Sequence, residues 1–407
     1  MVTNKEQNKL NVPHLRFPEF HGEWEKCKLG YIATLTKGSG ISKDQRSATG
    51  TPCILYGELY TTYKSEVIDY VVSKTDISDK NLVRSCANDI IIPSSGETAI
   101  DISTARCVLS PDVLLGGDLN IIRLKDGDGR FFSYQLNGVR KHDIAKIAQG
   151  VSVVHLYGES LKGLTVSFPS NKEQQKISTL LSLIDERIAT QSKLIEKLES
   201  LIKGLNDFLY TQFGDEVLTS FAELGTSYSG LSGKSAQDFG SGKPFITYLN
   251  VYSNNVIKEN DFQYVAIKDD EKQNVVKYGD VLFTLSSETP EEVGVGSVYL
   301  GKEKVYLNSF CFGIHITNTE VAFPPYLSYY VSLTAFRKFI YPYAQGSTRF
   351  NLCKADLEKA SIKLPTLADQ KRIYSVLGHI DCKIETERQM LNLYNSQKQY
   401  LLRQMFI

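Results

Sequence analysis

The stretch of sequence that decides the fold occurs twice: AQGVSVVHLYGESLKGLTVSFPSNKEQQKISTLLSLIDERI over residues 148–188 and AQGSTRFNLCKADLEKASIKLPTLADQKRIYSVLGHIDCKI over residues 344–384. The copies match without a gap at an offset of 196 residues (148 to 344), from Ala-Gln-Gly at the start to Ile-Asp near the end. Each copy runs through a short strand that ends in proline and then enters a segment with helical spacing. A repeat of this length predicts a duplicated architecture.

The second half of each repeat has the pattern of a long coiled-coil helix. Residues 171–213 contain no proline and one glycine, and their apolar residues recur in alternating steps of four and three. The second copy, 366–407, keeps this spacing but breaks at Glu387, which aligns with Gln191, and at Lys398. The predicted seam consists of Ile177, Leu181, Ile184, Ile188, Gln191, Ile195, Leu198, Ile202, Ile373, Leu377, Ile380, Ile384, Glu387 and Leu391.

The segment ahead of each helix has the composition of a mostly β domain. It is rich in Val, Ile, Tyr, Phe and Thr, and Gly, Asn and Asp punctuate it. A long helix with one narrow apolar seam is not stable alone in water, so the two helices are expected to pair. Because a globular domain precedes each helix, antiparallel pairing places one domain at each end. The predicted segments are 1–170, 171–213, 214–365 and 366–407.

Pairing of two helices leaves a second set of apolar positions on their outer face. These positions are Leu180, Leu183, Leu194 and Leu201 in the first helix. We expect them to be uncovered and available to helices of another protein.

Composition and motifs argue against several classes of protein. The 46 basic and 46 acidic residues cancel, which is unlike a simple basic nucleic-acid binder. No apolar run could span a bilayer and no secretory signal opens the chain, which indicates a cytoplasmic protein. Gly233-Lys234-Ser235 resembles the end of a P-loop, but Tyr228 stands where the motif needs its first glycine. The six histidines form no metal-ligand motif, so we predict no catalytic residue and no metal site.

Polar and basic loops fall at matching positions of the two copies. Their side chains suit contact with base edges and phosphates, although any one loop is also compatible with an ordinary solvated turn. The candidate DNA-binding residues are Lys37, Ser39, Lys43, Arg46, Ser94, Ser95, Glu97, Thr98, Gln149, Ser152, His155, Ser229, Lys234, Ser235, Ser286, Ser287, Glu288, Thr289, Gln345, Ser347, Thr348 and Arg349.

Taken over its whole length, the sequence resembles the specificity subunits of type I restriction–modification enzymes. The repeated Ala-Gln-Gly to Ile-Asp stretch carries the resemblance, together with the opening LRFPEFHGEW over residues 15–24. The resemblance implies an α+β fold: two mostly β target recognition domains, joined by two long antiparallel coiled-coil helices with a pseudo-two-fold internal repeat. Each recognition domain would read one half of a bipartite, asymmetric sequence in double-stranded DNA.

The same resemblance implies that the chain is not an enzyme by itself. The partners would be two modification (methyltransferase) subunits and two restriction (motor-nuclease) subunits. Adenine-N6 methylation with S-adenosylmethionine, and ATP- and Mg²⁺-dependent cleavage, would belong to those partners, with no cofactor bound by this chain and no membrane association.

One alternative suits the duplication and the heptads equally well: a non-enzymatic coiled-coil adaptor with two protein-binding β domains. The even charge balance adds an expectation to the DNA-reading hypothesis. Because no segment of the repeat is strongly basic, the isolated chain should hold DNA weakly, and its partners should supply much of the electrostatic attraction.

Overall fold

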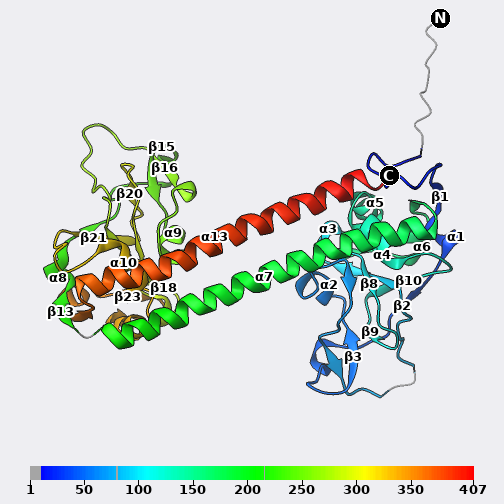
Figure 1. The fold of residues 1–407 in the computed structure, drawn as a ribbon, viewed down its shortest axis with the longest axis horizontal. Coiled ribbons are helices and arrows are strands. Elements are labelled where there is room, and N and C mark those ends of the chain that lie inside the picture. The colour runs from blue at the N-terminus through cyan, green and yellow to red at the C-terminus, as the bar shows by residue number, and fades with distance from the viewer. Residues whose placement is uncertain (1–10, 79–80, 215) are drawn as a thin grey trace, which may run out of the picture. The chain divides into compact units, whose positions relative to one another are not determined.

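The computed structural model describes residues 11–78, 81–214 and 216–407, which form two compact units (Figure 1). Unit 1 comprises Met1–Lys193 and Gln389–Ile407, and unit 2 comprises Leu194–Arg388. Two long helices, α7 (Asn171–Phe213) and α13 (Leu367–Gln404), each contribute one part to each unit. Each unit therefore contains one globular head and parts of both long helices.

The head of unit 1 is built on a five-stranded sheet of order β2-β10-β6-β8-β4, beside a three-stranded sheet β5-β3-β9 and the pairs β1-β12 and β11-β7. Its strands are β1 (Glu25–Lys28), β2 (Ala33–Lys37), β3 (Thr51–Ile54), β4 (Val67–Ile68), β5 (Lys74–Thr75), β6 (Asp89–Pro93), β7 (Ser95–Gly96), β8 (Arg106–Val108), β9 (Leu114–Leu115), β10 (Leu119–Leu124), β11 (Val154–His155) and β12 (Thr165–Phe168). Its helices are α1 (Leu29–Ile32), η1 (Lys43–Gln45), α2 (Glu58–Thr61), α3 (Ala99–Ile102), α4 (Gly129–Asn137), α5 (Lys141–Ile147) and α6 (Gly158–Lys162).

The head of unit 2 repeats this arrangement, with sheets of order β14-β21-β17-β19, β16-β15-β20, β18-β23-β22 and β13-β24. Its strands are β13 (Val217–Ser220), β14 (Gly225–Ser229), β15 (Phe239–Ile246), β16 (Gln263–Val265), β17 (Val281–Thr284), β18 (Ser286–Ser287), β19 (Gly296–Val298), β20 (Tyr306–Leu307), β21 (Cys311–Ile316), β22 (Ala344–Gln345), β23 (Phe350–Leu352) and β24 (Ser361–Leu364). Its helices are α8 (Phe221–Leu224), η2 (Ala236–Asp238), α9 (Tyr248–Ser253), η3 (Glu259–Asp261), η4 (Pro290–Glu292), α10 (Pro324–Tyr330), α11 (Thr334–Ile340), η5 (Tyr341–Tyr343) and α12 (Lys354–Lys359).

The central strands of both heads form because apolar and β-branched residues fill them. All five residues of β6 and all four of β17 are buried. Helix α4 in unit 1 and helix α10 in unit 2 pack their apolar residues into the same core as these sheets. The predicted fold class is therefore confirmed: mostly β heads with a few helices, long helices, and an internal repeat.

The repeated glutamine of the motif attaches each long helix to its own head. In unit 1 the Gln174 amide donates to the Pro169 carbonyl at 2.8 Å and accepts from the Asp128 backbone N–H at 2.9 Å. In unit 2 the Gln370 amide donates to the Pro365 carbonyl at 2.9 Å and accepts from the Phe323 N–H at 2.7 Å. Both glutamines are buried. Each forms hydrogen bonds with backbone groups that would otherwise be shielded from water and left without a hydrogen-bond partner.

The repeated Ile-Asp pair makes a second attachment, from the helix to a tyrosine of the head. The Tyr134 hydroxyl donates to the Asp185 carboxylate at 2.7 Å in unit 1. In unit 2 the Tyr329 hydroxyl donates to the carboxylate of Asp381. The residues that make the sequence repeat recognisable are thus those that fix each helix on its head.

Each head is also covered by the far end of the other long helix. In unit 1, Leu401 of α13 and Met405 just after this helix share a core with Ile177 and Leu181 of α7, while Lys398 pairs with Asp185 further along α7. The two helices therefore run antiparallel within unit 1. In unit 2 the partly buried residues near the end of α7 pack on the core that holds the start of α13; they are Ile202, Leu205 and Leu209.

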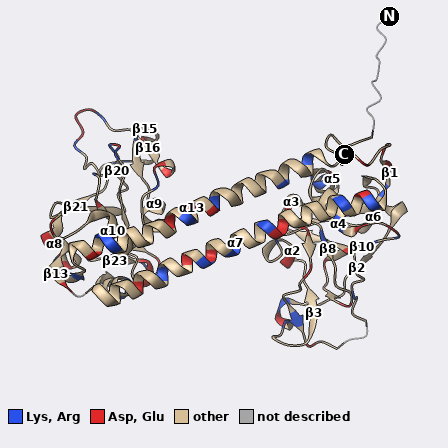
Figure 2. Cartoon of the chain, in the orientation of Figure 1, with Lys and Arg blue, Asp and Glu red and all other residues tan. Residues whose placement is uncertain are grey.

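The seam positions are buried or partly buried throughout. Glu387 is buried and forms an ion pair with Lys383, one turn earlier in α13. Basic and acidic residues are interspersed along the two helices (Figure 2).

The outer apolar positions differ from one another in exposure. Leu183, Leu194 and Leu201 are exposed by 54%, 38% and 52%. The expectation was wrong for Leu180, which is partly buried because it packs against the core of unit 1.

Candidate functional site

Three of the predicted polar segments meet at one end of the main sheet in unit 1. Lys37 is the last residue of β2 and pairs with Asn120 of β10. Ser94 directly follows β6, and its carbonyl accepts from the Leu156 N–H at 2.9 Å. The Asn120 amide in turn donates to the Leu156 carbonyl at 2.8 Å. These hydrogen bonds tie the ends of β2 and β6 to the segment after residue 149.

Unit 2 brings the equivalent segments together in the same way. Ser229 ends β14 and pairs with Phe312 of β21. Leu285 follows β17, and its carbonyl accepts from the Leu352 N–H at 2.8 Å. Both copies thus present three chain segments at one sheet end.

The most regular element at this end is a short hairpin, which we call the Gln-Gly hairpin: residues 149–155 in unit 1 and 345–351 in unit 2. In unit 1, Gln149 and His155 exchange two backbone hydrogen bonds, of 2.9 and 2.7 Å, and His155 pairs with Ser95 of β7. In unit 2, Gln345 pairs with Asn351, and Asn351 pairs with Ser286 of β18. The two hairpins share one backbone register, in which Asn351 occupies the position of His155.

The glycine after each glutamine is required by the turn. Gly150 has φ +122° and Gly346 has φ +138°, values that L side chains rarely adopt. A Cβ on either glycine would lie 2.1 Å from a backbone oxygen across the turn, that of Val153 or Arg349. The repeated Gln-Gly pair therefore encodes the hairpin shape itself.

Replacing Gly346 with alanine should open the hairpin of unit 2 and leave the rest of the unit folded. The expected cost is about 1–3 kcal/mol from the backbone conformation, to which the clash adds. Hydrogen–deuterium exchange should rise over residues 345–351 and stay unchanged in α13. Gly204→Ala is the matched control, because a Cβ there meets nothing within 4 Å and alanine favours the helix; equal protection of the hairpin in both variants would contradict the role of Gly346.

The tips of the two hairpins carry different side chains. Unit 1 exposes Val151, at 96%, together with Ser152 and Val153. Unit 2 exposes Ser347, Thr348 and Arg349. The Arg349 guanidinium lies 5.9 Å from the centre of the exposed Phe310 ring. One backbone frame thus presents an apolar tip in one unit and a polar, cationic tip in the other.

The other candidate residues fall into groups by exposure. Ser94, Ser286 and Ser287 are buried, and a buried hydroxyl reaches no ligand without rearrangement. Ser39, Ser95 and Lys234 are partly buried. The exposed candidates are Lys37, Lys43, Arg46, Glu97, Thr98, Gln149, Ser152, His155, Ser229, Ser235, Glu288, Thr289, Gln345, Ser347, Thr348 and Arg349.

Several candidates already have partners within the chain. Ser39 accepts from the Val83 N–H at 2.8 Å, and Thr98 caps α3 by accepting from the Asp101 N–H at 3.1 Å. The Lys234 ammonium donates to the Ala266 carbonyl at 2.6 Å and forms an ion pair with Glu271 at 2.5 Å. Their role in DNA contact stays a prediction.

Two candidate groups lie by the smaller sheets instead. Lys43 belongs to η1, where Ser42 and Gln45 form a capping box, and Arg46 lies 3.7 Å from Glu58. In unit 2, Ser235 makes the equivalent capping box with Asp238 at η2. No hydrogen bond of the described segments links either group to a Gln-Gly hairpin.

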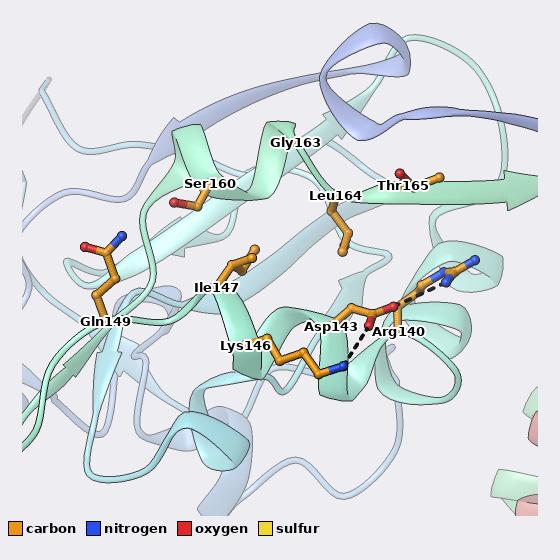
Figure 3. A pocket seen from close by; sticks show the side chains of 9 residues that line it. All are labelled: Arg140, Asp143, Lys146, Ile147, Gln149, Ser160, Gly163, Leu164 and Thr165. Carbon is orange, nitrogen blue, oxygen red and sulfur yellow. Dashed lines mark hydrogen bonds and ion pairs between the residues drawn. The ribbon is translucent and has the colours of Figure 1, made fainter.

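Gln149 also lies at one end of a surface pocket of unit 1, with Arg140 at the other end (Figure 3). Between them the Asp143 carboxylate lies 3.3 Å from Arg140 and 3.9 Å from Lys146. The charges in this pocket are thus paired with one another, an arrangement typical of a structural ion network.

A buried acid holds the main sheet of each head together. The Asp89 carboxylate accepts two hydrogen bonds from Arg123, at 2.8 and 2.7 Å. At the matching place in unit 2, Asp280 accepts from the Tyr228 hydroxyl at 2.7 Å and lies 2.9 Å from the His315 ring nitrogen. Burial raises the pKa of Asp280. These groups join strands and do not reach the sheet end that carries the hairpins.

Asn351 is an exposed polar residue of the hairpin that the sequence prediction did not include. The offset of 196 residues already places it at the position equivalent to His155, so the repeat contained the signal.

Over the described segments, no three His, Cys, Asp or Glu side chains converge as metal ligands. None of the described helices is long and apolar enough to cross a membrane.

Comparison with known proteins places this architecture in a family. Residues 21–200 and 225–393 match the family described as type I restriction modification DNA specificity domain. A putative type I restriction enzyme MjaX specificity subunit of Methanocaldococcus jannaschii is 26% identical, over 94% of this chain and 92% of that protein. The type I restriction enzyme MjaVIII specificity subunit of the same organism is 23% identical, over 94% and 91%.

Solved structures show the same fold. The S subunit of a type I restriction–modification system from M. genitalium superposes with a TM-score of 0.59 at 17% identity, covering 97% of this chain and 99% of that one. A chain from a study of complex assembly and conformational transition of the type I R-M system gives a TM-score of 0.57 at 15% identity, covering 93% and 96%.

Proposed function

The chain belongs to the family of type I restriction–modification DNA specificity proteins, whose role is DNA sequence recognition, and on that premise we propose that it reads a bipartite, asymmetric target. Each head would read one half-site in double-stranded DNA. The observation that supports this is the pair of Gln-Gly hairpins, which share a backbone register but differ in side chains. Two hairpins with the same backbone register and different side chains suit two different half-sites, whereas a protein that binds a palindromic site would carry the same side chains in both hairpins.

The chain would supply the choice of sequence, and partner subunits would supply the chemistry. Two modification subunits would methylate adenine N6 with S-adenosylmethionine, and two restriction subunits would use ATP and Mg²⁺. The complex would act in the cytoplasm. The balanced charge of this chain, 46 basic and 46 acidic residues, favours weak DNA binding by the chain alone, because few phosphates would be neutralised.

The proposal is tested by expressing the chain with a type I modification subunit and sequencing the methylated bases of the host genome. We expect one motif, made of two unlike half-sites separated by a gap of fixed length. Methylation without a bipartite motif would contradict it, and so would no methylation by a modification subunit that is active with its own specificity subunit. An adaptor with two protein-binding heads would produce the second outcome.

The outer faces of the long helices are the proposed docking surface for the modification subunits. Leu194 and Met390 stand at equivalent positions of α7 and α13 and are exposed by 38% and 40%. Apolar side chains exposed on the surface of a helix are typical of an interface. Because these apolar residues are exposed, we expect the chain to be poorly soluble without its partners.

Changing Leu194 and Met390 together to aspartate should abolish co-purification of the modification subunit while leaving the chain folded. Each charge would be desolvated in the interface, and a loss of roughly 2–5 kcal/mol in binding is expected. The control is Thr190→Asp with Thr386→Asp, which changes two exposed residues at equivalent positions on the same helices. If the chain with Leu194→Asp and Met390→Asp still co-purifies with the modification subunit, the docking surface lies elsewhere.

A further inference from the structure

We propose that Asn351 is a specificity-determining residue of unit 2 and that it reads its half-site from the place where His155 reads the other half-site in unit 1. The inference rests on the proposed function and goes beyond it by assigning one residue in each head to base recognition. Neither the family match nor the repeat motif, which differs between copies at this position, identifies Asn351.

The backbone register establishes the equivalence. Ser95 pairs with His155, and Gln149 bridges to His155 on the other side. These three residues therefore form a row across neighbouring strands. In unit 2 the equivalent row consists of Ser286, Asn351 and Gln345. Residues that pair directly across neighbouring strands have side chains on the same face. Each unit therefore presents a row of an amide and one further polar side chain: glutamine and histidine in unit 1, glutamine and asparagine in unit 2.

The alternation of β23 directs Asn351 away from the core. Leu352 is buried in the core of unit 2, whereas Asn351 is exposed. Because side chains of a strand alternate between its faces, Asn351 lies opposite Leu352, on the face it shares with Gln345. The hairpin tip, from Ser347 to Arg349, is exposed as well.

The amides in these rows are free to bind a ligand. In the part of the chain that the structure describes, no hydrogen bond occupies the side chains of Gln149, Gln345 or Asn351. Several serine and threonine candidates nearby are instead buried or bonded, as Ser287 is to Glu292 at 2.9 Å. Within the described segments, the His155 ring stacks on Tyr157, with 6.2 Å between the ring centres.

The chemistry of the row matches the edge of adenine. A two-stranded hairpin fits the major groove, where asparagine and glutamine amides form paired hydrogen bonds to adenine N6 and N7. Paired residues of this kind are about 5.5 Å apart at Cα, close enough for their side chains to contact neighbouring base pairs, which rise about 3.4 Å each. We therefore expect Asn351 to select adenine, and His155 to select a different base in the other half-site.

The experiment uses the full chain co-expressed with its modification subunit, with methylome sequencing as the readout. Asn351→Ala should relax preference at one base pair of one half-site by roughly 5- to 150-fold and leave the other half-site unchanged. Asn351→His should change the preferred base at that same position, and His155→Asn should do so in the opposite half-site. Asn260→Ala, an exposed asparagine of η3, is the matched control and should leave the motif intact.

The outcomes separate this inference from the proposed function. If the wild-type chain directs no bipartite methylation, the proposed function fails. If the wild-type motif is present and Asn351→Ala leaves every position unchanged, Asn351 is not a reader and only the inference is overturned. A uniform loss of methylation across all positions would make Asn351 a phosphate contact and would overturn it as well. Hydrogen exchange over 345–351 distinguishes either result from loss of the hairpin.

Discussion

Replacing Lys398 with methionine should lower the free energy of unfolding of unit 1 by about 3–5 kcal/mol. Lys398 pairs with the carboxylates of Glu66 and Asp185, and all three side chains are almost fully shielded from water. Removing the lysine takes away the cation that pairs directly with both buried carboxylates, and the buried Arg106 guanidinium is then the nearby positive charge that still interacts with them. The fluorescence of Trp24, the only tryptophan, reports unfolding of unit 1 during denaturant titration.

Two further variants separate the buried charge from a general effect of losing a lysine. Lys162→Met removes an exposed ion pair of the same unit, with Glu159, and should cost less than about 1 kcal/mol. Adding Glu66→Gln to Lys398→Met should recover part of the loss, because one unpaired carboxylate is removed. A Lys398→Met variant as stable as the Lys162 control would show that the buried triad contributes nothing.

The pH dependence of the stability that Lys398 contributes follows from the direction in which its pKa is shifted. Burial lowers the pKa of Lys398, but the nearby carboxylates of Glu66 and Asp185 outweigh it and raise the pKa above 10.5. Because the pKa of Lys398 is higher in the folded than in the unfolded chain, its contribution to stability is fully present at pH values below the pKa of the unfolded state. It is lost as the pH rises through the folded value. The stability difference between wild type and Lys398→Met should therefore be constant around neutral pH and shrink in strong alkali.

Replacing Phe406 with alanine should destabilise unit 1 by a similar amount, about 3–5 kcal/mol. Phe406 is buried, and its ring centre lies 5.1 Å from Phe131 and 6.4 Å from Trp24. The substitution leaves a cavity between the end of α13 and the N-terminal segment before β1. The unfolding transition seen by Trp24 fluorescence should move to lower denaturant concentration.

Tyr210→Ala is the matched variant in unit 2, because Tyr210 stands 196 residues before Phe406. Tyr210 packs edge-on against Tyr330 at 5.9 Å and donates to the Lys363 carbonyl at 3.1 Å. Its loss should destabilise unit 2, followed by hydrogen exchange, and leave the Trp24 transition where it is. If Phe406→Ala does not shift the Trp24 transition, α13 does not stabilise the head of unit 1 in solution.

The long helices and the duplication were predictable because their signals are local and periodic. A four-three spacing of apolar residues over 171–213, with one polar position at Gln191, has few structural solutions, and α7 spans those residues. The β character of the heads also followed from composition. Strand order did not, because pairings such as β2 with β10 join residues far apart in the chain.

Lys398 shows where the pattern was insufficient. In the sequence it is a break in an apolar seam, and only the packed structure reveals Glu66 and Asp185 beside it. The corresponding position in α7 is Ile202, so the repeat offered no hint of the pair. Leu180 shows the opposite error. The pattern predicted that this residue would be uncovered, but it packs on the head of unit 1, and the position of the head cannot be read from the periodicity of the helix.

The candidate site divides in the same way. The sequence by itself determined that polar loops recur at matching positions and that Gln-Gly opens one of them, because glycine tolerates a positive φ that other residues avoid. Only the tertiary structure decided which loops meet at one sheet end, which serines are buried, and that Asn351 shares a row with Gln345. Periodicity along a chain defines elements and their apolar faces. Which side chains become neighbours depends on pairing between distant segments, and that information is not contained in any one of them.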